Sequence, residues 1–292
     1  MRIAFLGLGR MGDPMARRLV GAFELAVFNR DMARAKPFEA LGARVAGSVR
    51  EAVAGAEVAI TMLSDDAAEE AITFGPGGLL EALAPEAIHV SMSTIGIATS
   101  ARLGETHAEA GQGFVAAPVF GRPPAAAAGQ LWILAAGPED QVAKCQPLFQ
   151  LLGQGVFPLG GRASTAHAMK LAGNSLLVTA VEALSEAFAY GEKAGVAPET
   201  TLKILNTALL KSPLADAYGG AVVRGDFEPA GFALRLGLKD VSLALRAAEA
   251  YQAPLPIASL LHDRLLSAVA KGYGDQDLAA LSRLSREDAG LT

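Results

Sequence analysis

Short apolar runs alternate with stretches of helical periodicity through residues 1–160 of the chain. Runs of about five apolar residues, bounded by glycine or polar turns, are typical of strands buried in a parallel sheet. The strands expected are residues 3–6, 25–28, 43–46, 58–63, 88–92, 113–116, 131–136 and 156–159. The helices expected between them are residues 11–22, 32–41, 49–54, 67–74, 78–84, 99–110 and 141–152. This alternation predicts an α/β fold with a doubly wound parallel sheet and helices on both faces.

The pattern changes after residue 160, where helical periodicity continues without intervening strands. The helices expected there are residues 166–193, 197–210, 239–251 and 255–271. We therefore expect an α/β domain over residues 1–162 and an all-helical domain over residues 163–292, joined by a long helix. The biased run PPAAAA at residues 123–128 is expected to be a loop that leads into a helix or strand.

Composition narrows the class of protein. Of the 292 residues, 51% are hydrophobic, which is typical of a globular protein and excludes a disordered chain. The net charge of −5 argues against nucleic acid as a partner, and no apolar stretch reaches the length of a membrane span. The single cysteine, Cys145, cannot form an internal disulfide and has no metal-ligand spacing. These features predict a cytoplasmic protein without a metal site.

The sequence GLGRMG follows the first expected strand and precedes the first expected helix. In the G-x-G-x-x-G spacing, the first glycine permits a tight turn and the second lets a pyrophosphate approach the backbone. The third allows the helix to pack closely on the strand, and the helix N-terminus attracts phosphate. The loop therefore predicts a dinucleotide site, whose residues are Gly7, Leu8, Gly9, Arg10, Met11 and Gly12.

The sequence VFNRDM stands at the end of the second expected strand, where the adenosine ribose of a dinucleotide is bound. An acidic side chain at this position suits the 2′-hydroxyl of NAD, whereas a cation suits the 2′-phosphate of NADP. Asn29 and Arg30 occupy the position, and a guanidinium binds phosphate through two hydrogen bonds. We therefore expect NADP(H) rather than NAD(H). In the alternative, Arg30 is solvated and Asp31 contacts the ribose.

Lys170 lies near the start of the long Ala/Leu-rich helix, with Asn174 one turn later and His167 one turn earlier. A lysine in such a helix is either a solvated surface charge or a group that moves a proton in a cleft. His167 lies on roughly the same face, and we expect it to pack or to support its neighbours.

Five motifs in this chain resemble, in order, those of the β-hydroxyacid dehydrogenases. This family contains 3-hydroxyisobutyrate dehydrogenases and the tartronate semialdehyde and glyoxylate/succinic semialdehyde reductases. The motifs are GLGRMGDPMARRL, TMLSD, MSTIG, GNSLL preceded by Lys170, and GFALRLGLKDVSLAL. The resemblance implies a Rossmann domain, a long interdomain helix and an all-α domain of the 6-phosphogluconate dehydrogenase type. It also implies a homodimer or homotetramer.

The resemblance implies that five further residues lie at the cofactor. Leu63 and Ser64 would lie beside it, and Lys239 would reach it from the helical domain. Ser93 and Thr94 would lie near the nicotinamide and the substrate.

The resemblance also implies the chemistry. Lys170 would face the cleft between the domains as general acid and base in hydride transfer to a small aldehyde or keto acid. Asn174 would hold the lysine or bind the substrate, and Phe232 and Asp240 would border the active site.

The chain departs from the family pattern in the substrate loop, which here reads AAPVFGRPPAAAAGQL. Phe120 stands where serine is usual and Arg122 where glycine is usual, while Ser91 replaces a frequent aspartate. Arg122 would bind a substrate carboxylate by its side chain or point to solvent, and Gly121 still permits close backbone approach. These departures leave two alternatives open, an NADPH-dependent imine reductase and a cofactor-binding scaffold without activity.

Overall fold

The structure, a computed structural model, describes residues 1–209 and 211–291. The chain forms two compact units, Met1–Lys170 and Leu171–Thr292, and the division falls inside one long helix, α9 (Ser164–Lys193). Among the described residues, no helix combines the length and apolar character needed to cross a membrane.

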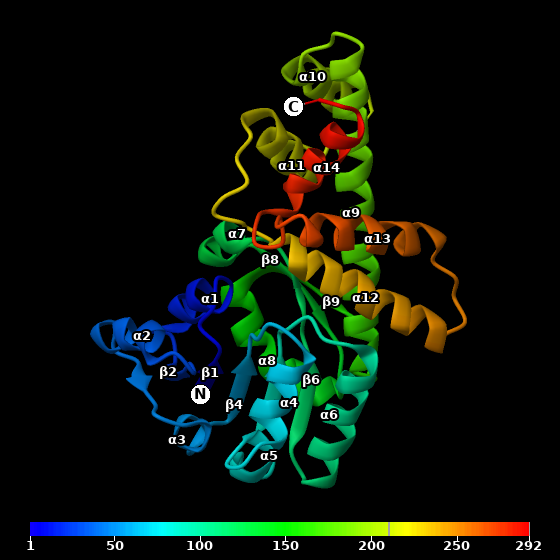
Figure 1. The fold of residues 1–292 in the computed structure, drawn as a ribbon. Coiled ribbons are helices and arrows are strands. Elements are labelled where there is room, and N and C mark those ends of the chain that lie inside the picture. Colours follow the sequence, from blue (N-terminus) through cyan, green and yellow to red (C-terminus); the bar gives the residue numbers. More distant parts are fainter. Residues whose placement is uncertain (210, 292) are drawn as a thin grey trace. The chain divides into compact units, whose positions relative to one another are not determined.

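A six-stranded parallel sheet forms the centre of the first unit (Figure 1). Its strands are β1 (Arg2–Leu6), β2 (Glu24–Phe28), β3 (Arg44–Val45), β4 (Val58–Thr61), β5 (Ile88–Ser91) and β6 (Gly113–Ala116). The order β3-β2-β1-β4-β5-β6 is that of the doubly wound fold, which reverses direction between β1 and β4. The predicted Rossmann architecture is therefore confirmed, and the carboxyl ends of β1 and β4 flank the point where such folds bind ligands.

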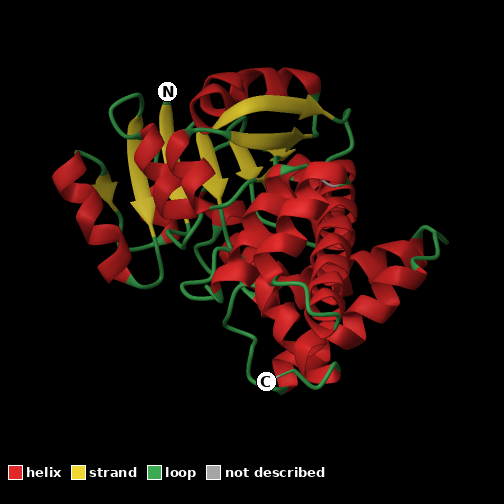
Figure 2. Ribbon diagram, turned by 90° about the horizontal axis from the view of Figure 1, so that it is seen from above, coloured by secondary structure: helices red, strands yellow, loops and turns green. Residues whose placement is uncertain are grey.

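Helices cover both faces of this sheet (Figure 2). They are α1 (Gly12–Leu19), α2 (Met32–Ala35), α3 (Val49–Val53), α4 (Asp66–Phe74), α5 (Leu79–Ala82), α6 (Ile97–Glu109) and α8 (Glu139–Leu152). The helix expected over residues 32–41 is divided into α2 and a 3₁₀ helix, η1 (Lys36–Leu41), because Pro37 has no N–H with which to continue the α-helix.

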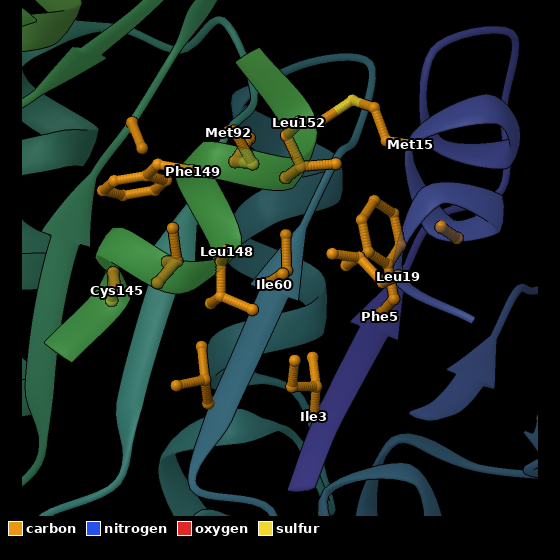
Figure 3. Packing of buried hydrophobic residues seen from close by; sticks show 14 of the residues in the cluster. Ile3, Phe5, Met15, Leu19, Ile60, Met92, Cys145, Leu148, Phe149 and Leu152 are labelled. Carbon is orange, nitrogen blue, oxygen red and sulfur yellow. The ribbon is translucent and has the colours of Figure 1, made fainter. Parts of the chain in front are cut away.

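Alternating side chains of β1 enter two different cores. Ile3 and Phe5 belong to the same buried cluster as Met15 of α1 and Phe149 of α8, and Figure 3 shows these side chains. Ala4 and Leu6 point the other way and belong to a cluster under α3 and α5. This two-residue period explains why the strand is apolar throughout, because both of its faces are buried.

The last three strands of the first unit depart from the predicted parallel sheet. Strands β7 (Val119–Phe120), β8 (Leu131–Ala135) and β9 (Gly153–Pro158) form a separate sheet in which β7 and β8 are antiparallel. The short strand β7 was not predicted. Only two residues separate it from β6, and a connection of this length cannot form the crossover that parallel strands require.

The run at residues 123–128 is a helix, α7 (Pro123–Ala128), so the expectation of a loop was wrong. Proline is tolerated in the first turn, where its missing N–H costs nothing, and the alanines favour helix. The helix ends at Gly129, whose φ of +68° is the left-handed conformation common at helix C-termini.

The second unit is helical, as predicted. Its elements after α9 are α10 (Pro198–Ala208), α11 (Pro213–Arg224), α12 (Leu234–Ala250), α13 (Pro256–Ala270), the 3₁₀ helix η2 (Leu278–Ala280) and α14 (Leu281–Asp288). Helices α11 and α14 were not predicted. The last residue of the helix predicted over 197–210 lies outside the described residues. Val178 and Val181 of α9 pack with Leu234, Leu265 and Leu281 in the core of this unit.

Candidate functional site

In the loop between β1 and α1, two glycines are required by the fold itself and one is not. Gly7 has a φ of +100°, and a Cβ on it would lie 2.5 Å from the carbonyl oxygen of Met62. A Cβ on Gly12 would lie 1.8 Å from the carbonyl oxygen of Gly7. Around Gly9, in contrast, no described protein atom lies within 4 Å of a Cβ. The packing of the protein explains Gly7 and Gly12, whereas Gly9 leaves the open backbone that a pyrophosphate needs.

The start of α1 fits an anionic group as well. No side chain caps this N-terminus, which leaves the positive end of the helix dipole to an external anion. Arg10 is exposed and Met11 is half-buried beside it, while Leu8 is buried in the core. The residues present therefore fit the pyrophosphate of a dinucleotide.

Three polar side chains follow β2, of which two make hydrogen bonds within the protein and one is exposed. Asn29 accepts a hydrogen bond from the Leu8 N–H (2.8 Å) and donates one to the Asp31 carbonyl (2.9 Å). Asp31 accepts from the Ala33 N–H at the start of α2. Arg30 is exposed, and within the described chain it makes no hydrogen bond or ion pair. Asn29 therefore supports the glycine loop, Asp31 caps a helix, and Arg30 is the side chain left to meet a ligand.

The loops that follow β4 and β5 are tied together at the carboxyl end of the sheet. The Leu63 N–H donates to the Ser93 hydroxyl oxygen (2.8 Å), and Ser93 is fully buried. Ser64 donates to the Asp65 carboxylate (2.9 Å), and Thr94 is half-buried. The structure thus brings Leu63 and Ser93 into contact, although they come from separate motifs.

Lys170 is buried, with 8% of its surface exposed, and its ammonium nitrogen lies 4.3 Å from the centre of the Phe120 ring. A cation at this distance from an aromatic face is stabilised by the ring quadrupole. Phe120 belongs to β7, where it pairs with Trp132. Gly121 has a φ of +141°, which other residues rarely adopt, and a Cβ on it would lie 2.5 Å from Cδ2 of Leu131, so the fold itself favours this glycine. Arg122 is half-buried at the start of α7.

His167 connects the first turn of α9 to the segment after β5 through hydrogen bonds. Its Nε2 lies 3.2 Å from the Ser93 carbonyl oxygen, and its Nδ1 lies 2.8 Å from the Ser100 hydroxyl. Since a carbonyl oxygen only accepts, Nε2 is the donor in this pair. The supporting role expected of His167 is confirmed, and it holds Lys170, one turn later, on a helix anchored beside Ser93.

In the second unit, three predicted residues lie together. The Asn174 amide donates to the Asp240 carboxylate (2.5 Å), and both side chains are buried. The Lys239 ammonium lies 3.1 Å from the other Asp240 oxygen, outside hydrogen-bond geometry, so this contact is an ion pair. Phe232 packs against the core of the unit instead, and its N–H donates to Asp277.

Sequence reasoning missed a buried polar cluster beneath the loops after β4 and β5. Glu69, His89 and His107 are fully buried and joined by short contacts. The sequence signal was His89, a polar residue between the apolar residues Ile88 and Val90 of β5. A buried strand accepts such a residue only when its nitrogens find partners, and those partners come from distant segments.

The fold and the glycine loop define a dinucleotide-binding oxidoreductase, and sequence comparison agrees. Residues 2–161 match the family described as the NAD binding domain of 6-phosphogluconate dehydrogenase. Residues 164–285 match the family described as NAD-binding of NADP-dependent 3-hydroxyisobutyrate dehydrogenase. The chain belongs to the β-hydroxyacid dehydrogenase family.

Individual relatives cover nearly the whole chain. The uncharacterized oxidoreductase YfjR of Bacillus subtilis (strain 168) is 46% identical over 96% of this chain and 98% of its own length. Glyoxylate/succinic semialdehyde reductase 1 of Arabidopsis thaliana is 32% identical over 96% of this chain and 97% of its own.

Solved structures agree on the fold. The Mycobacterium tuberculosis 3-hydroxyisobutyrate dehydrogenase, described with L-serine, superposes with a TM-score of 0.85 at 31% identity, covering 98% of this chain and 100% of that one. An imine reductase from Pseudomonas sp. superposes with a TM-score of 0.64 at 22% identity, covering 97% and 98%, which shows a shared fold alone.

Proposed function

We propose that this protein is an NADP(H)-dependent reductase of a small aldehyde or keto acid, with Lys170 as its general acid and base. The observation that carries the proposal is the burial of the Lys170 ammonium in the same compact unit as the glycine loop. A buried cation is costly unless it is stabilised or used, and the face of the Phe120 ring beside this ammonium contributes to its stabilisation.

We assign the following roles to the residues of the chain. The bound nicotinamide supplies or accepts the hydride. Lys170 donates a proton to the substrate oxygen during reduction and takes it back during oxidation. The charge of its ammonium also stabilises the negative charge that develops on that oxygen. Phe120 shields the ammonium from water, which strengthens this electrostatic interaction. We assign Asn174, one turn further along α9, to positioning the substrate.

The preference for NADP(H) over NAD(H) rests on Arg30. Its guanidinium is exposed at the end of β2 and has no partner within the described chain, whereas Asp31 is engaged as a helix cap. The arrangement supplies a cation for a 2′-phosphate and leaves no free carboxylate in the place where a 2′-hydroxyl would need one.

We propose that the substrate carries a carboxylate, which Arg122 at the start of α7 would bind. The Arabidopsis relative, named as a glyoxylate/succinic semialdehyde reductase, supports this chemical class. We also propose a homodimer or homotetramer located in the cytoplasm, a reducing compartment in which the free thiol of Cys145 would persist.

Phe120 favours a second candidate, an imine reductase. Its ring adds an apolar wall next to Lys170 and offers no hydrogen bond to a carboxylate. Such a wall suits an uncharged cyclic imine better than a small anionic acid. Lys170 itself argues for the first candidate, because an imine that arrives protonated needs no ammonium beside it.

The test is oxidation of NADPH, and separately of NADH, in the presence of glyoxylate, succinic semialdehyde, methylmalonate semialdehyde, tartronate semialdehyde or a cyclic imine. We expect turnover of one of the acids with NADPH preferred, a loss of about 100-fold or more in kcat for Lys170→Ala, and unchanged turnover for Lys193→Ala. Lys193 is the matched control because it is an exposed lysine at the end of the same helix.

Other outcomes would redirect the assignment. Reduction of the imine alone, unaffected by Lys170→Ala, would replace the first candidate by the second. Binding of NADPH without turnover of any compound would favour a scaffold that binds cofactor and has no activity.

A further inference from the structure

A continuous chain of buried polar side chains runs beneath the loops that follow β4 and β5. Its members come from six segments: Thr61, Glu69, His89, Ser93, His107 and Gln112. Each of their side-chain nitrogen and oxygen atoms has a hydrogen-bond or ion-pair partner. No group of three or more His, Cys, Asp or Glu among the described residues is arranged to hold a metal ion. These side chains therefore form a hydrogen-bonded network, in which donors and acceptors can be followed from one residue to the next.

The network starts at Gln112, whose orientation is determined by its neighbours. Its amide nitrogen donates to the carbonyl oxygens of Leu83 (2.7 Å) and Leu80 (3.2 Å). Its amide oxygen must then accept from His107 Nδ1, 2.7 Å away. Burial lowers the pKa of His107 to about 3, so this ring is neutral at pH 7 and its Nε2 accepts. The donor to that nitrogen is Nδ1 of His89, at 2.9 Å.

The other nitrogen of His89 faces Thr61 and Glu69. Its Nε2 lies 2.9 Å from the Thr61 hydroxyl and 3.3 Å from a Glu69 carboxylate oxygen. The hydroxyl proton of Thr61 is donated to that same Glu69 oxygen (2.5 Å). Both nitrogens of the His89 ring therefore have partners inside this network.

The lowered pKa of the Glu69 carboxyl group agrees with these contacts. Burial alone would raise the pKa of its carboxyl group, but hydrogen bonds from His89, Thr61 and Ser93 together hold it below its ordinary value. A buried carboxylate is tolerated when several donors satisfy it, and here these donors are present.

The second carboxylate oxygen of Glu69 contacts the loop that follows β5. It accepts the hydroxyl proton of Ser93 (2.7 Å), and the Ser93 oxygen in turn accepts the Leu63 N–H (2.8 Å). Because its proton is directed to Glu69, the Ser93 hydroxyl presents a lone pair to Leu63. The orientation of one buried carboxylate therefore fixes the backbone of the loop after β4 against the residue that begins the loop after β5.

We propose that Glu69 is a positioning residue for the cofactor: held by His89 and Thr61, it orients Ser93 so that the loops carrying Leu63 and Thr94 are preorganised for the nicotinamide. The inference rests on the proposed function, because these loops matter for catalysis only if a dinucleotide binds there. Glu69 itself does not touch the cofactor, and its effect passes through Ser93.

The test compares two variants at Glu69 with a matched control on the same helix. Glu69→Ala removes both acceptors. Glu69→Gln retains the network in one orientation: its amide nitrogen donates to Thr61, and its oxygen still accepts from Ser93. Thr73→Val is the control, because Thr73 is a buried residue of α4 whose hydroxyl has no hydrogen-bond partner.

The first readout is the dissociation constant for NADPH, measured by fluorescence of the reduced nicotinamide. We expect Glu69→Ala to weaken binding about tenfold or more, as the loss of one buried hydrogen bond predicts, and Glu69→Gln to remain within about threefold of wild type. Thr73→Val should match wild type. A merely structural role would lower thermal stability in Glu69→Ala and leave the NADPH affinity of the folded protein unchanged, which would overturn the inference.

The second readout does not require Glu69→Ala to fold. In ¹H–¹⁵N spectra of the histidine rings, Glu69→Gln should shift the signals of His89, which contacts Glu69, and leave those of His262, in the second unit, unchanged. A His89 ring unaffected by Glu69→Gln would overturn the inference. If wild type binds no NADPH or NADH, the proposed function fails and the inference fails with it. If wild type and Glu69→Ala bind NADPH equally, the inference fails alone.

Discussion

His107 should make the first unit of this protein sensitive to mild acid. Its ring is fully buried, and burial, followed by the charge on His89, lowers its pKa from 6.5 to about 3. The unfolded chain therefore binds a proton as the pH falls below 6.5, while the folded protein does not. Stability conferred by the neutral ring is complete above 6.5 and declines as the pH falls toward 3.

The magnitude follows from the two pKa values. Each pH unit between them costs up to ~1.4 kcal/mol, so lowering the pH from 7.5 to 5 should reduce the free energy of unfolding by about 2 kcal/mol. Glu69, whose pKa is below 4.5, adds its own loss only under more acidic conditions. The window from pH 7.5 to pH 5 therefore separates the contribution of His107 from that of Glu69.

The assay is urea unfolding followed by the fluorescence of Trp132, the single tryptophan, which lies in β8 and so reports on the first unit. His107→Gln is the reference, because an amide supplies both a donor and an acceptor to the network but does not titrate. The difference between the two proteins cancels contributions from other groups, including Glu182, whose pKa is raised by burial. Parallel stability curves for wild type and His107→Gln between pH 7.5 and pH 5 would refute this reasoning.

Three further predictions concern the glycine loop, the ribose site and the thiol. Gly9→Ala should have a free energy of unfolding within about 0.5 kcal/mol of wild type but should lose NADPH affinity. Gly12→Ala should be destabilised by several times that amount, because its Cβ meets a carbonyl oxygen. Equal stability of the two variants in urea titrations would contradict the contacts described. Arg30→Gln should raise KM for NADPH about tenfold or more and leave KM for NADH unchanged, and a parallel rise in both would remove the phosphate role. Cys145, whose pKa burial raises to about 12, should resist a thiol reagent at pH 8 until denaturant is added, and rapid labelling of the native protein would contradict its burial.

Much of the first unit could be predicted from sequence because its signals are local. The glycine spacing, the two-residue period of β1 and the single apolar runs of the other strands each depend on neighbours a few positions apart. The same holds for α9, whose periodicity is uninterrupted. The errors fell where local propensity was weak or ambiguous: PPAAAA forms α7, and the short connection after β6 places the last strands in a separate sheet with one antiparallel pair.

The sequence by itself determined the alternation of elements, the dinucleotide loop and the candidates Lys170 and Arg30, because residue type and spacing express those features directly, and its family resemblance added Ser93. Tertiary structure alone decided that Asp31 caps a helix, that Phe120 covers Lys170, and that Glu69 meets His89. These last contacts join segments far apart in the chain. A hydrogen bond or an ion pair depends on distance and direction in space, and residue order specifies neither until the sheet and its helices have folded.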